Sequence, residues 1–261
     1  EILDRADALR RKRAEADAKA ACILPALFYQ MFGDPATNSM GWPFVKLCDL
    51  GKVTTGNTPA RNIPSHYGNH IEWVKPDNLN APSHIVTTAL EGLSEEGRGK
   101  GRVVPAGSTL VTCIAGSRES IGNAGLTERN VAFNQQINAV TPDCDTDAYF
   151  LYATILSLKK VIQGASSGGM VGIVNKSNFE SIPAFRPPVD LQTKFGEEFL
   201  TLLNLLKSQV ASRQRQTNLF QSLLHRAFSG DLTALWREAH MKELLAEMEH
   251  QARVLGAGVL R

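Results

Sequence analysis

Two long segments of the chain repeat apolar residues at alternating spacings of four and three. In the first 34 residues the repeat falls on Ile2, Ala6, Leu9, Arg13, Ala16, Ala20, Ile23 and Leu27. From about residue 191 to residue 228 it falls on Phe195, Phe199, Leu202, Leu206, Arg213, Phe220, Leu223 and Ala227. Such a repeat is typical of a helix that packs along another helix. Each stripe has an arginine in its middle, which we expect to set the register of the pair at some cost in stability.

Both predicted helices end in a similar way. The first ends at Phe32-Gly33-Asp34 and the second at Phe228-Ser229-Gly230-Asp231, which is a faint internal repeat on either side of the intervening residues. Pro25 lies inside the first pattern and predicts a kink, because proline removes a helical hydrogen bond. A further amphipathic helix is expected from about residue 234 to residue 254.

Between the two helices, short β-rich runs alternate with turn clusters. The expected strands cover residues 45–47, 71–74, 85–88, 109–114 and 137–141, with one helix at about 148–162. This pattern indicates an α+β fold class, with a mixed α/β head inserted between two long antiparallel, coiled-coil-like helices. The expected parts are a first helix (1–35), the head (36–188), a second helix (189–230) and a C-terminal helix (231–261).

Composition describes an ordinary globular protein and not a strongly basic one. The 261 residues are 43% apolar and 21% charged, with a formal net charge of +2. A DNA-binding face would therefore require local clustering of charge. The four cysteines are scattered and form no CxxC pair, so we expect no metal or disulfide framework and a reducing cytoplasmic setting. No apolar run is long enough to cross a membrane, so no membrane association is expected.

The sequence carries no intact catalytic motif. The segment 51–58 is close to a P-loop, but Asn57 stands where that motif needs a lysine. His66 and His70 are four residues apart in a non-helical segment, which favours two surface histidines over a zinc site. There is no nucleophile elbow, kinase signature, dinucleotide fingerprint or amino-methyltransferase motif. We therefore expect no catalysis by this chain. Because the chain opens at Glu1 and not at a methionine, we also expect it to be part of something longer.

A set of short motifs in a fixed order resembles a known family. The motifs are Trp42-Pro43-Phe44, Gly56-Asn57-Thr58-Pro59, Ile71-Glu72-Trp73-Val74-Lys75-Pro76, Ser166-Ser167-Gly168-Gly169, Val171-Gly172-Ile173-Val174-Asn175-Lys176, Ile182-Pro183, Pro187-Pro188 and Leu191-Gln192. They resemble the target recognition domain of type I restriction–modification specificity subunits. The two helices with the Gly-Asp endings are similar to that family's spacer helices, so the resemblance covers nearly the whole chain.

The resemblance implies a definite function. A complete subunit of that family carries two recognition domains held apart by two antiparallel helices, and each domain recognises one half of a split double-stranded DNA target. The helices dock methyltransferase (modification) subunits that use S-adenosylmethionine, and a restriction subunit joins them. S-adenosylmethionine, ATP and Mg are accordingly expected on partner subunits, with no cofactor on this chain. Because there is one head, the chain is expected to be the C-terminal half of a full subunit or a half-length form that pairs with itself.

The candidate DNA contacts are polar side chains on loops, where base edges and phosphates can reach them. They are Thr55, Asn57, Thr58, Arg61, Lys75, Asn78, Arg98, Lys100, Arg102, Arg118, Gln135, Ser166, Ser167, Gly168, Asn175 and Lys176. We expect Asn57 and Arg118 to contact bases. We expect Lys100, in a glycine-alternating loop at 98–102, to contact phosphates.

Each group of candidates also has a structural interpretation. The segment 55–61 is equally consistent with a tight turn, and the amides of residues 134–136 with buried supports of loops. Asp77 and Asn78 are typical of residues that cap their own backbone. The segment 98–102 is typical of a solvated surface loop, and Glu119 is placed to pair with Arg118. These alternatives remain open at the level of sequence.

Two further functions compete with DNA recognition. The chain would be a coiled-coil assembly scaffold whose head binds protein, or the recognition end of a fused restriction–methylation enzyme. A salt-dependent shift of duplex DNA by the isolated chain separates recognition from the scaffold. The long apolar stripes also predict self-association, because one head does not cover them.

Overall fold

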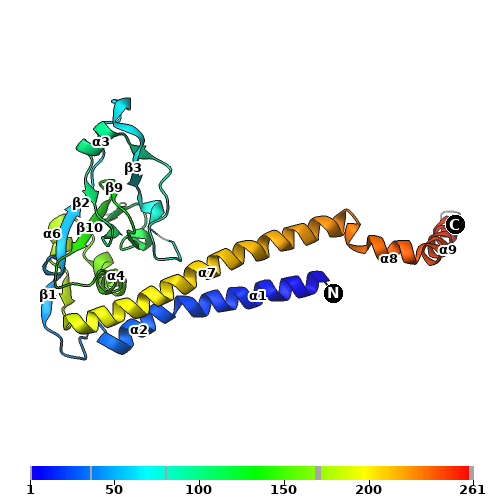
Figure 1. Cartoon of the computed structure of the whole chain (residues 1–261), viewed down its shortest axis with the longest axis horizontal. Coiled ribbons are helices and arrows are strands. Elements are labelled where there is room, and N and C mark those ends of the chain that lie inside the picture. The colour runs from blue at the N-terminus through cyan, green and yellow to red at the C-terminus, as the bar shows by residue number, and fades with distance from the viewer. Residues whose placement is uncertain (1, 36, 80, 168–171, 259–261) are drawn as a thin grey trace. The chain divides into compact units, whose positions relative to one another are not determined.

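The computed structural model describes residues 2–35, 37–79, 81–167 and 172–258 (Figure 1). It contains two compact units. One comprises residues 18–207 and the other comprises residues 1–17 together with 208–261. The predicted mixture of helices and strands is confirmed. The strands named below lie in the unit of residues 18–207.

The central sheet of the head has four antiparallel strands. In spatial order they are β2 (Gly51–Thr55), β10 (Ile137–Pro142), β6 (Thr109–Thr112) and β8 (Ala124–Leu126). Every residue of β6 and β8 is buried, including the polar Thr109 and Thr112. Both faces of these two strands are therefore covered.

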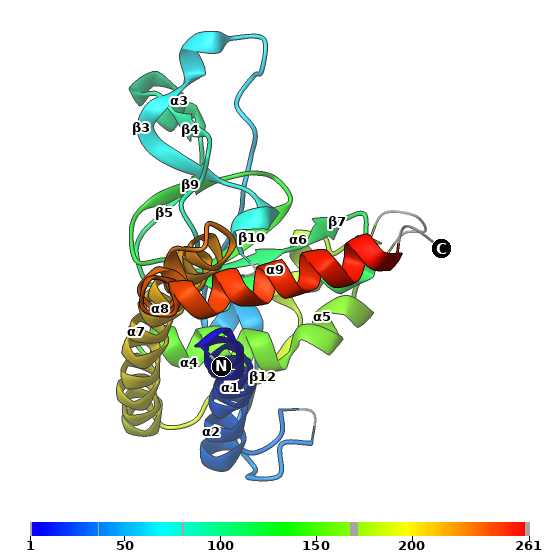
Figure 2. The same ribbon diagram turned by 90° about the vertical axis from the view of Figure 1, so that its right-hand side faces the viewer.

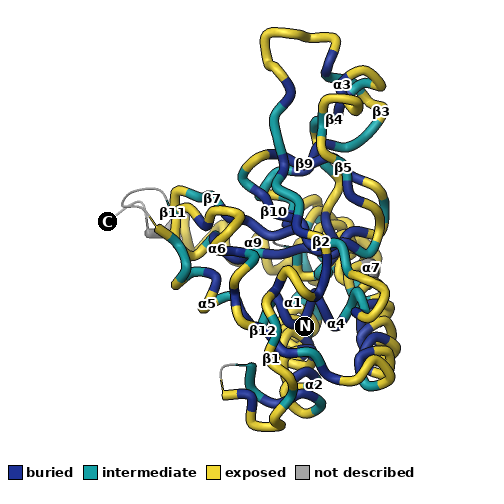
Figure 3. Tube along the Cα trace, turned by 90° about the vertical axis from the view of Figure 1, so that its left-hand side faces the viewer, coloured by how far each residue is buried: buried dark blue, intermediate teal, exposed yellow. Residues whose placement is uncertain are grey.

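A second four-stranded sheet projects from the central sheet (Figures 2 and 3). Its strands, in spatial order, are β4 (Gly92–Leu93), β3 (Tyr67–Val74), β9 (Val131–Phe133) and β5 (Val103–Val104). Strands β3 and β9 are parallel, and β3 changes register against β4 between Tyr67 and Ile71. Helix α3 (Glu95–Lys100) packs on β3.

Two short antiparallel pairs complete the strands. They are β1 (Phe44–Lys46) with β12 (Pro183–Phe185), and β7 (Ile114–Ala115) with β11 (Gly172–Ile173). In Figures 2 and 3 the pair of β7 and β11, together with α5 (Lys159–Gly164), projects sideways, away from the direction of the second sheet. Helix α6 (Lys176–Glu180) follows β11.

An aromatic cluster joins the head to the long helices. Helices α2 (Ile23–Phe32) and α4 (Ala148–Ser157) meet the first half of α7 (Val189–Phe228) in this unit. The ring of Phe28, 2% exposed, lies 5.8 Å from Phe195, 6.1 Å from Phe185 and 6.2 Å from Phe150, between ring centroids. Asp147 begins α4, because its carboxylate accepts the backbone N–H groups of the first turn.

The other unit contains helices and the turns between them, among the residues described. Arg13 and Arg213, the two arginines of the predicted stripes, both contact Asp17, at 3.1 and 4.0 Å respectively. The Arg10 guanidinium lies 4.4 Å from the centroid of the Phe220 ring. The remaining helices of this unit are α8 (Ala234–Ala239) and α9 (Met241–Gly258).

Several local predictions were wrong. The first helix is not continuous, since it is interrupted at Cys22, between α1 (Ile2–Ala21) and α2; this break lies in the turn before Pro25, where the expected kink falls. The helix expected at 148–162 divides into α4 and α5, and the C-terminal helix divides at His240. Residues 85–88 form no strand; Ile85 makes only an isolated bridge to Leu126. The strand expected at 109–114 ends at Thr112, and β7 follows after Cys113.

Candidate nucleic-acid interface

The loop at residues 56–61 is fixed by the side chain of Asn57. The Asn57 amide nitrogen donates to the carbonyl oxygen of Lys100, and its amide oxygen accepts the backbone N–H of Arg102, both at 2.8 Å. The indole N–H of Trp73 donates to the Asn57 carbonyl at 3.2 Å. The amide of Asn57 is therefore occupied by backbone groups and positions two loops relative to each other.

The turn at residues 134–136 connects two groups of candidate residues. On one side, the Gln135 amide oxygen accepts a hydrogen bond from the hydroxyl of Thr58. On the other side, the Gln136 carbonyl accepts the backbone N–H of Ile114 at 3.1 Å, where β7 begins. Close packing at this turn requires glycine, since a Cβ on Gly56 would lie 2.0 Å from a backbone carbonyl oxygen. The 56–61 loop and the start of β7 thus meet at one turn.

Arg61 and Lys75 share a carboxylate and an aromatic support. The Arg61 Nη1 lies 3.0 Å from a carboxylate oxygen of Glu91, and its guanidinium carbon lies 4.7 Å from the Tyr67 ring centroid and 4.8 Å from that of Trp73. The Lys75 ammonium contacts the other Glu91 oxygen and lies 5.3 Å from the Trp73 ring. Hydrogen bonds from Lys75 and then Arg61 lower the pKa of Glu91, so this carboxylate stays charged.

The predicted loop at 98–102 is wrong for its first half, because Arg98 and Lys100 lie on α3. The Ser94 hydroxyl accepts the backbone N–H of Gly97 at 3.0 Å, and acidic residues fill the first turn, so capping outweighs the glycine content. Both basic side chains are exposed and form no ion pair with any residue that the structure describes. Arg102 follows the helix and donates to the Thr55 carbonyl at 2.6 Å.

Two candidates have hydrogen bonds that favour a structural role. The Asn78 amide oxygen accepts the Lys75 backbone N–H at 3.0 Å, and its nitrogen donates to Thr87 and Thr88 at 3.1 and 3.2 Å. The Thr55 hydroxyl donates to the amide oxygen of Asn138 on β10 at 2.7 Å. The structure therefore agrees with the alternative interpretation, in which Asn78 caps the backbone of its own turn.

Arg118 lies on the projecting segment after β7. Its carbonyl accepts a hydrogen bond from the Gln163 amide nitrogen at 3.1 Å, which ties this segment to α5. Its side chain is exposed, and no ion pair with Glu119 is present. Arg118 is thus a free cation with respect to the described part of the chain.

The remaining candidates lie on either side of β11, the strand that pairs with β7. Ser167 exchanges backbone hydrogen bonds with Ile173 at 2.9 and 3.0 Å, while Gly168 lies outside the described residues. Ser166 is half-buried just before this bridge. Asn175 begins α6 by accepting the Asn178 N–H at 2.8 Å, and Lys176 pairs with Glu180 at 3.4 Å. The contacts of Ser167 and Asn175 therefore hold the backbone around β11.

A family model described as "Type I restriction modification DNA specificity domain" matches residues 40–212, which is more than half of the chain. The chain belongs to this family. The HindI specificity subunit of Haemophilus influenzae is 28% identical over 198 residues, covering 74% of this chain and 42% of that subunit. This specificity domain chain therefore spans less than half the length of the curated relatives it matches.

Solved structures share the fold of this specificity domain. A structure described for the assembly and conformational transition of the type I R-M system has a TM-score of 0.61 at 18% identity, covering 87% of this chain and 56% of that chain. The HsdS subunit from Thermoanaerobacter tengcongensis has a TM-score of 0.56 at 17% identity, covering 88% and 56%. These likenesses concern the fold alone.

Several residues of the interface were not found by sequence reasoning. Glu91 is not among the residues predicted from the sequence, although it is the carboxylate that two candidate cations share. The surface interpretation of the histidines fails for His66, which is 6% exposed and lies 3.6 Å from Glu96. Trp73 lies in the strand expected at 71–74 and was the available signal for the aromatic support, whereas Tyr67 lies outside that range.

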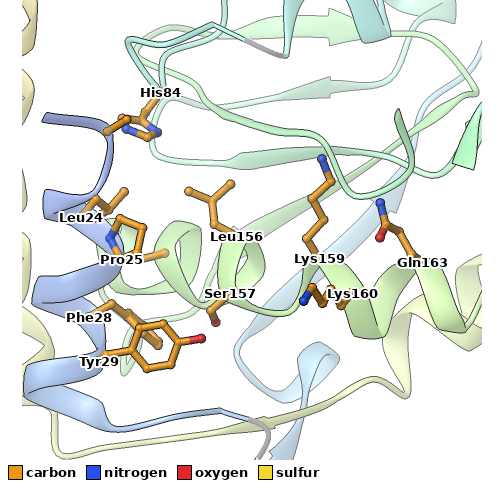
Figure 4. A pocket seen from close by; sticks show the side chains of 12 residues that line it. Leu24, Pro25, Phe28, Tyr29, His84, Leu156, Ser157, Lys159, Lys160 and Gln163 are labelled. Carbon is orange, nitrogen blue, oxygen red and sulfur yellow. The ribbon is translucent and has the colours of Figure 1, made fainter. Parts of the chain in front are cut away.

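The specificity domain also contains an apolar cavity of about 520 Å³ between α2 and α4 (Figure 4). Leu24 and Phe28 line it at one side and Lys159 and Lys160 at the other, with Leu156 between them. No group of three His, Cys, Asp or Glu side chains suited to a metal ion occurs among the residues described. In the same part of the chain, no helix is sufficiently long and apolar to cross a membrane.

Proposed function

We propose that this specificity domain recognises one half of a bipartite double-stranded DNA target within a type I restriction–modification complex and catalyses no reaction itself. The observation that carries the proposal is the meeting of the 56–61 loop and the β7 segment at the turn of residues 134–136. Arg61 lies at the end of the 56–61 loop, and Arg118 follows β7 on the other side of this turn. Polar and cationic side chains on fixed loops are suited to contacts with base edges and with phosphates.

We further propose that the two long helices pack antiparallel in the manner of a coiled coil. In one unit Phe28 contacts Phe195, and in the other Arg10 contacts Phe220 while Asp17 contacts Arg213. Within the second unit, residues further along α1 contact residues earlier in α7. This order supports an antiparallel pair there, with Asp17 between the two stripe arginines as a charged layer that fixes register.

By family membership, methyltransferase subunits and a restriction subunit are the proposed partners. S-adenosylmethionine, ATP and Mg would bind to those partners, and the complex would act in the cytoplasm. Self-association or pairing with a second half-subunit would supply the second half-site that one head lacks. Light scattering of the purified chain at micromolar concentration tests this point: a strict monomer would contradict self-association and leave DNA recognition intact.

The test of recognition is the binding of the whole chain to labelled duplexes that contain a randomised segment. We expect the logarithm of the association constant to fall linearly with the logarithm of salt concentration, and we expect one short sequence to be enriched. Binding without enrichment would reduce the proposal to nonspecific DNA association. Failure to bind any duplex would favour the scaffold whose head binds protein.

A further inference from the structure

We propose that Arg61 recognises a guanine in the major groove of the target and that Glu91 positions it for this contact. The proposal rests on the proposed DNA-recognition function and assigns one side chain to one type of base. Guanine presents two acceptors, O6 and N7, in the major groove, and arginine is the side chain that pairs with both.

Arg61 is held on three sides before any ligand is present. Its guanidinium carbon lies 4.7 Å from the Tyr67 ring centroid and 4.8 Å from the Trp73 centroid, and Nη1 lies 3.0 Å from Glu91. The rings are fixed in turn, because the Tyr67 hydroxyl donates to the Pro59 carbonyl at 2.7 Å. An arginine held in this way loses little further rotamer freedom when it binds a base.

Arg61 retains the donors that guanine requires. A guanidinium has five N–H donors, and the ion pair with Glu91 is made through Nη1. The Arg61 side chain is 54% exposed, so part of its donor-bearing edge faces solvent. Two N–H groups are sufficient for the O6 and N7 atoms of one guanine.

The shared carboxylate favours a base over a phosphate. Glu91 contacts both Arg61 and Lys75, so an incoming phosphate would be repelled by a neighbouring negative charge. A base edge is uncharged and does not experience this repulsion to the same degree. Lys100 shows the opposite environment, exposed and without an ion pair to any described residue, and fits a phosphate.

The other candidates around the 56–61 loop are less free to recognise a base. The amides of Asn57 and Asn78 are occupied by hydrogen bonds within the head. The Arg102 guanidinium donates to the Thr55 carbonyl. Arg61 is therefore the side chain near this loop that combines a fixed position with unused donors.

The first experiment compares the sequences enriched by the wild-type chain with those enriched by Arg61→Ala, Arg61→Lys and the control Lys100→Ala. We expect Arg61→Ala to lose the preference for one guanine about tenfold and to keep the remaining pattern. Arg61→Lys keeps the charge without the planar fork, so it should lose part of the same preference and carries the test if the alanine variant does not fold. Lys100→Ala should weaken binding to all sequences alike.

The second experiment replaces the selected guanine by 7-deazaguanine, which lacks the N7 acceptor. Wild-type affinity should fall several-fold, whereas Arg61→Ala should bind both duplexes equally. An enriched sequence without an Arg61-dependent guanine, or an equal loss from 7-deazaguanine in both proteins, would overturn the proposal while DNA recognition stands. If the wild type enriches no sequence, the proposed function fails as well.

The positioning role of Glu91 has its own test. Glu91→Gln should raise the affinity for all duplexes, because a negative charge is removed, and should weaken the guanine preference several-fold. Glu128→Gln is the matched control, since Glu128 pairs with Lys207 on α7 at 2.7 Å and makes the same change in net charge. An unchanged guanine preference in Glu91→Gln, or an equal loss in Glu128→Gln, would overturn the role of Glu91.

Discussion

Replacement of Asn57 by alanine distinguishes a residue that supports the interface from one that contacts a base. The side chain makes two hydrogen bonds of 2.8 Å, to the Lys100 carbonyl and from the Arg102 N–H. Each such bond contributes about 0.5–1.5 kcal/mol to stability, and water can replace part of this at a half-exposed position. We therefore expect Asn57→Ala to lower the free energy of unfolding by about 1–2 kcal/mol.

Three measurements check this expectation. Urea unfolding gives the loss of stability, and hydrogen exchange should show faster exchange of the Arg102 amide, which loses its acceptor. DNA binding should weaken for all duplexes, because the 56–61 loop is less well held. Asn69→Ala is the control, since Asn69 is an exposed asparagine on β3. If Asn57→Ala keeps full stability and changes only the preferred sequence, Asn57 contacts a base and the structural argument is refuted.

Three further outcomes follow from the packing and charges. Phe28→Ala should lower the free energy of unfolding by about 3–5 kcal/mol in urea titrations, because the ring is 2% exposed between several aromatic rings. A loss below about 1 kcal/mol, closer to that of a surface substitution, would contradict the role of the cluster. Burial lowers the pKa of His84, so stability should be full above about pH 6.5 and fall as the pH drops below it. His84→Asn, which tolerates the φ of 64° at this position, should flatten that dependence. Lys100→Ala should reduce the salt slope of DNA binding by about 1, whereas Arg118→Ala should change the preferred sequence, and equal effects of the two would contradict the assignment.

The long helices were predictable because their signal is local. The seven-residue spacing and the Phe-to-Gly-Asp endings placed α7 at 191–228, and the structure has it at Val189–Phe228. The charged layer at Asp17 could be anticipated only in part. Arg13 and Arg213 interrupt the apolar stripes, but the aspartate that both contact carries no periodic signal.

The geometry of the interface was not predictable, because its partners are distant in sequence. Arg61 and Glu91 are 30 residues apart, and Asn57 and the Lys100 carbonyl are 43 residues apart. Residue type alone placed Asn57 and Arg61 among the candidates, but it could not separate an amide occupied by backbone from a cation with unused donors. Helix α3 was also not predicted from the sequence, because the glycine-rich composition of residues 97–101 indicated a loop and the capping by Ser94 outweighs that composition.

The charge balance of the chain bears on how affinity and selectivity are divided. The net charge is +2, and several cations of the head are already paired with carboxylates: Arg61 and Lys75 with Glu91, and Lys176 with Glu180. Other cations of the head, among them Lys52, Arg98 and Lys100, form no ion pair with any described residue and remain for phosphates, so binding by the head should depend on salt. Base contacts on fixed loops depend on geometry more than on total charge. Affinity and selectivity should therefore respond to different substitutions, the first to changes at the unpaired cations and the second to changes at Arg61.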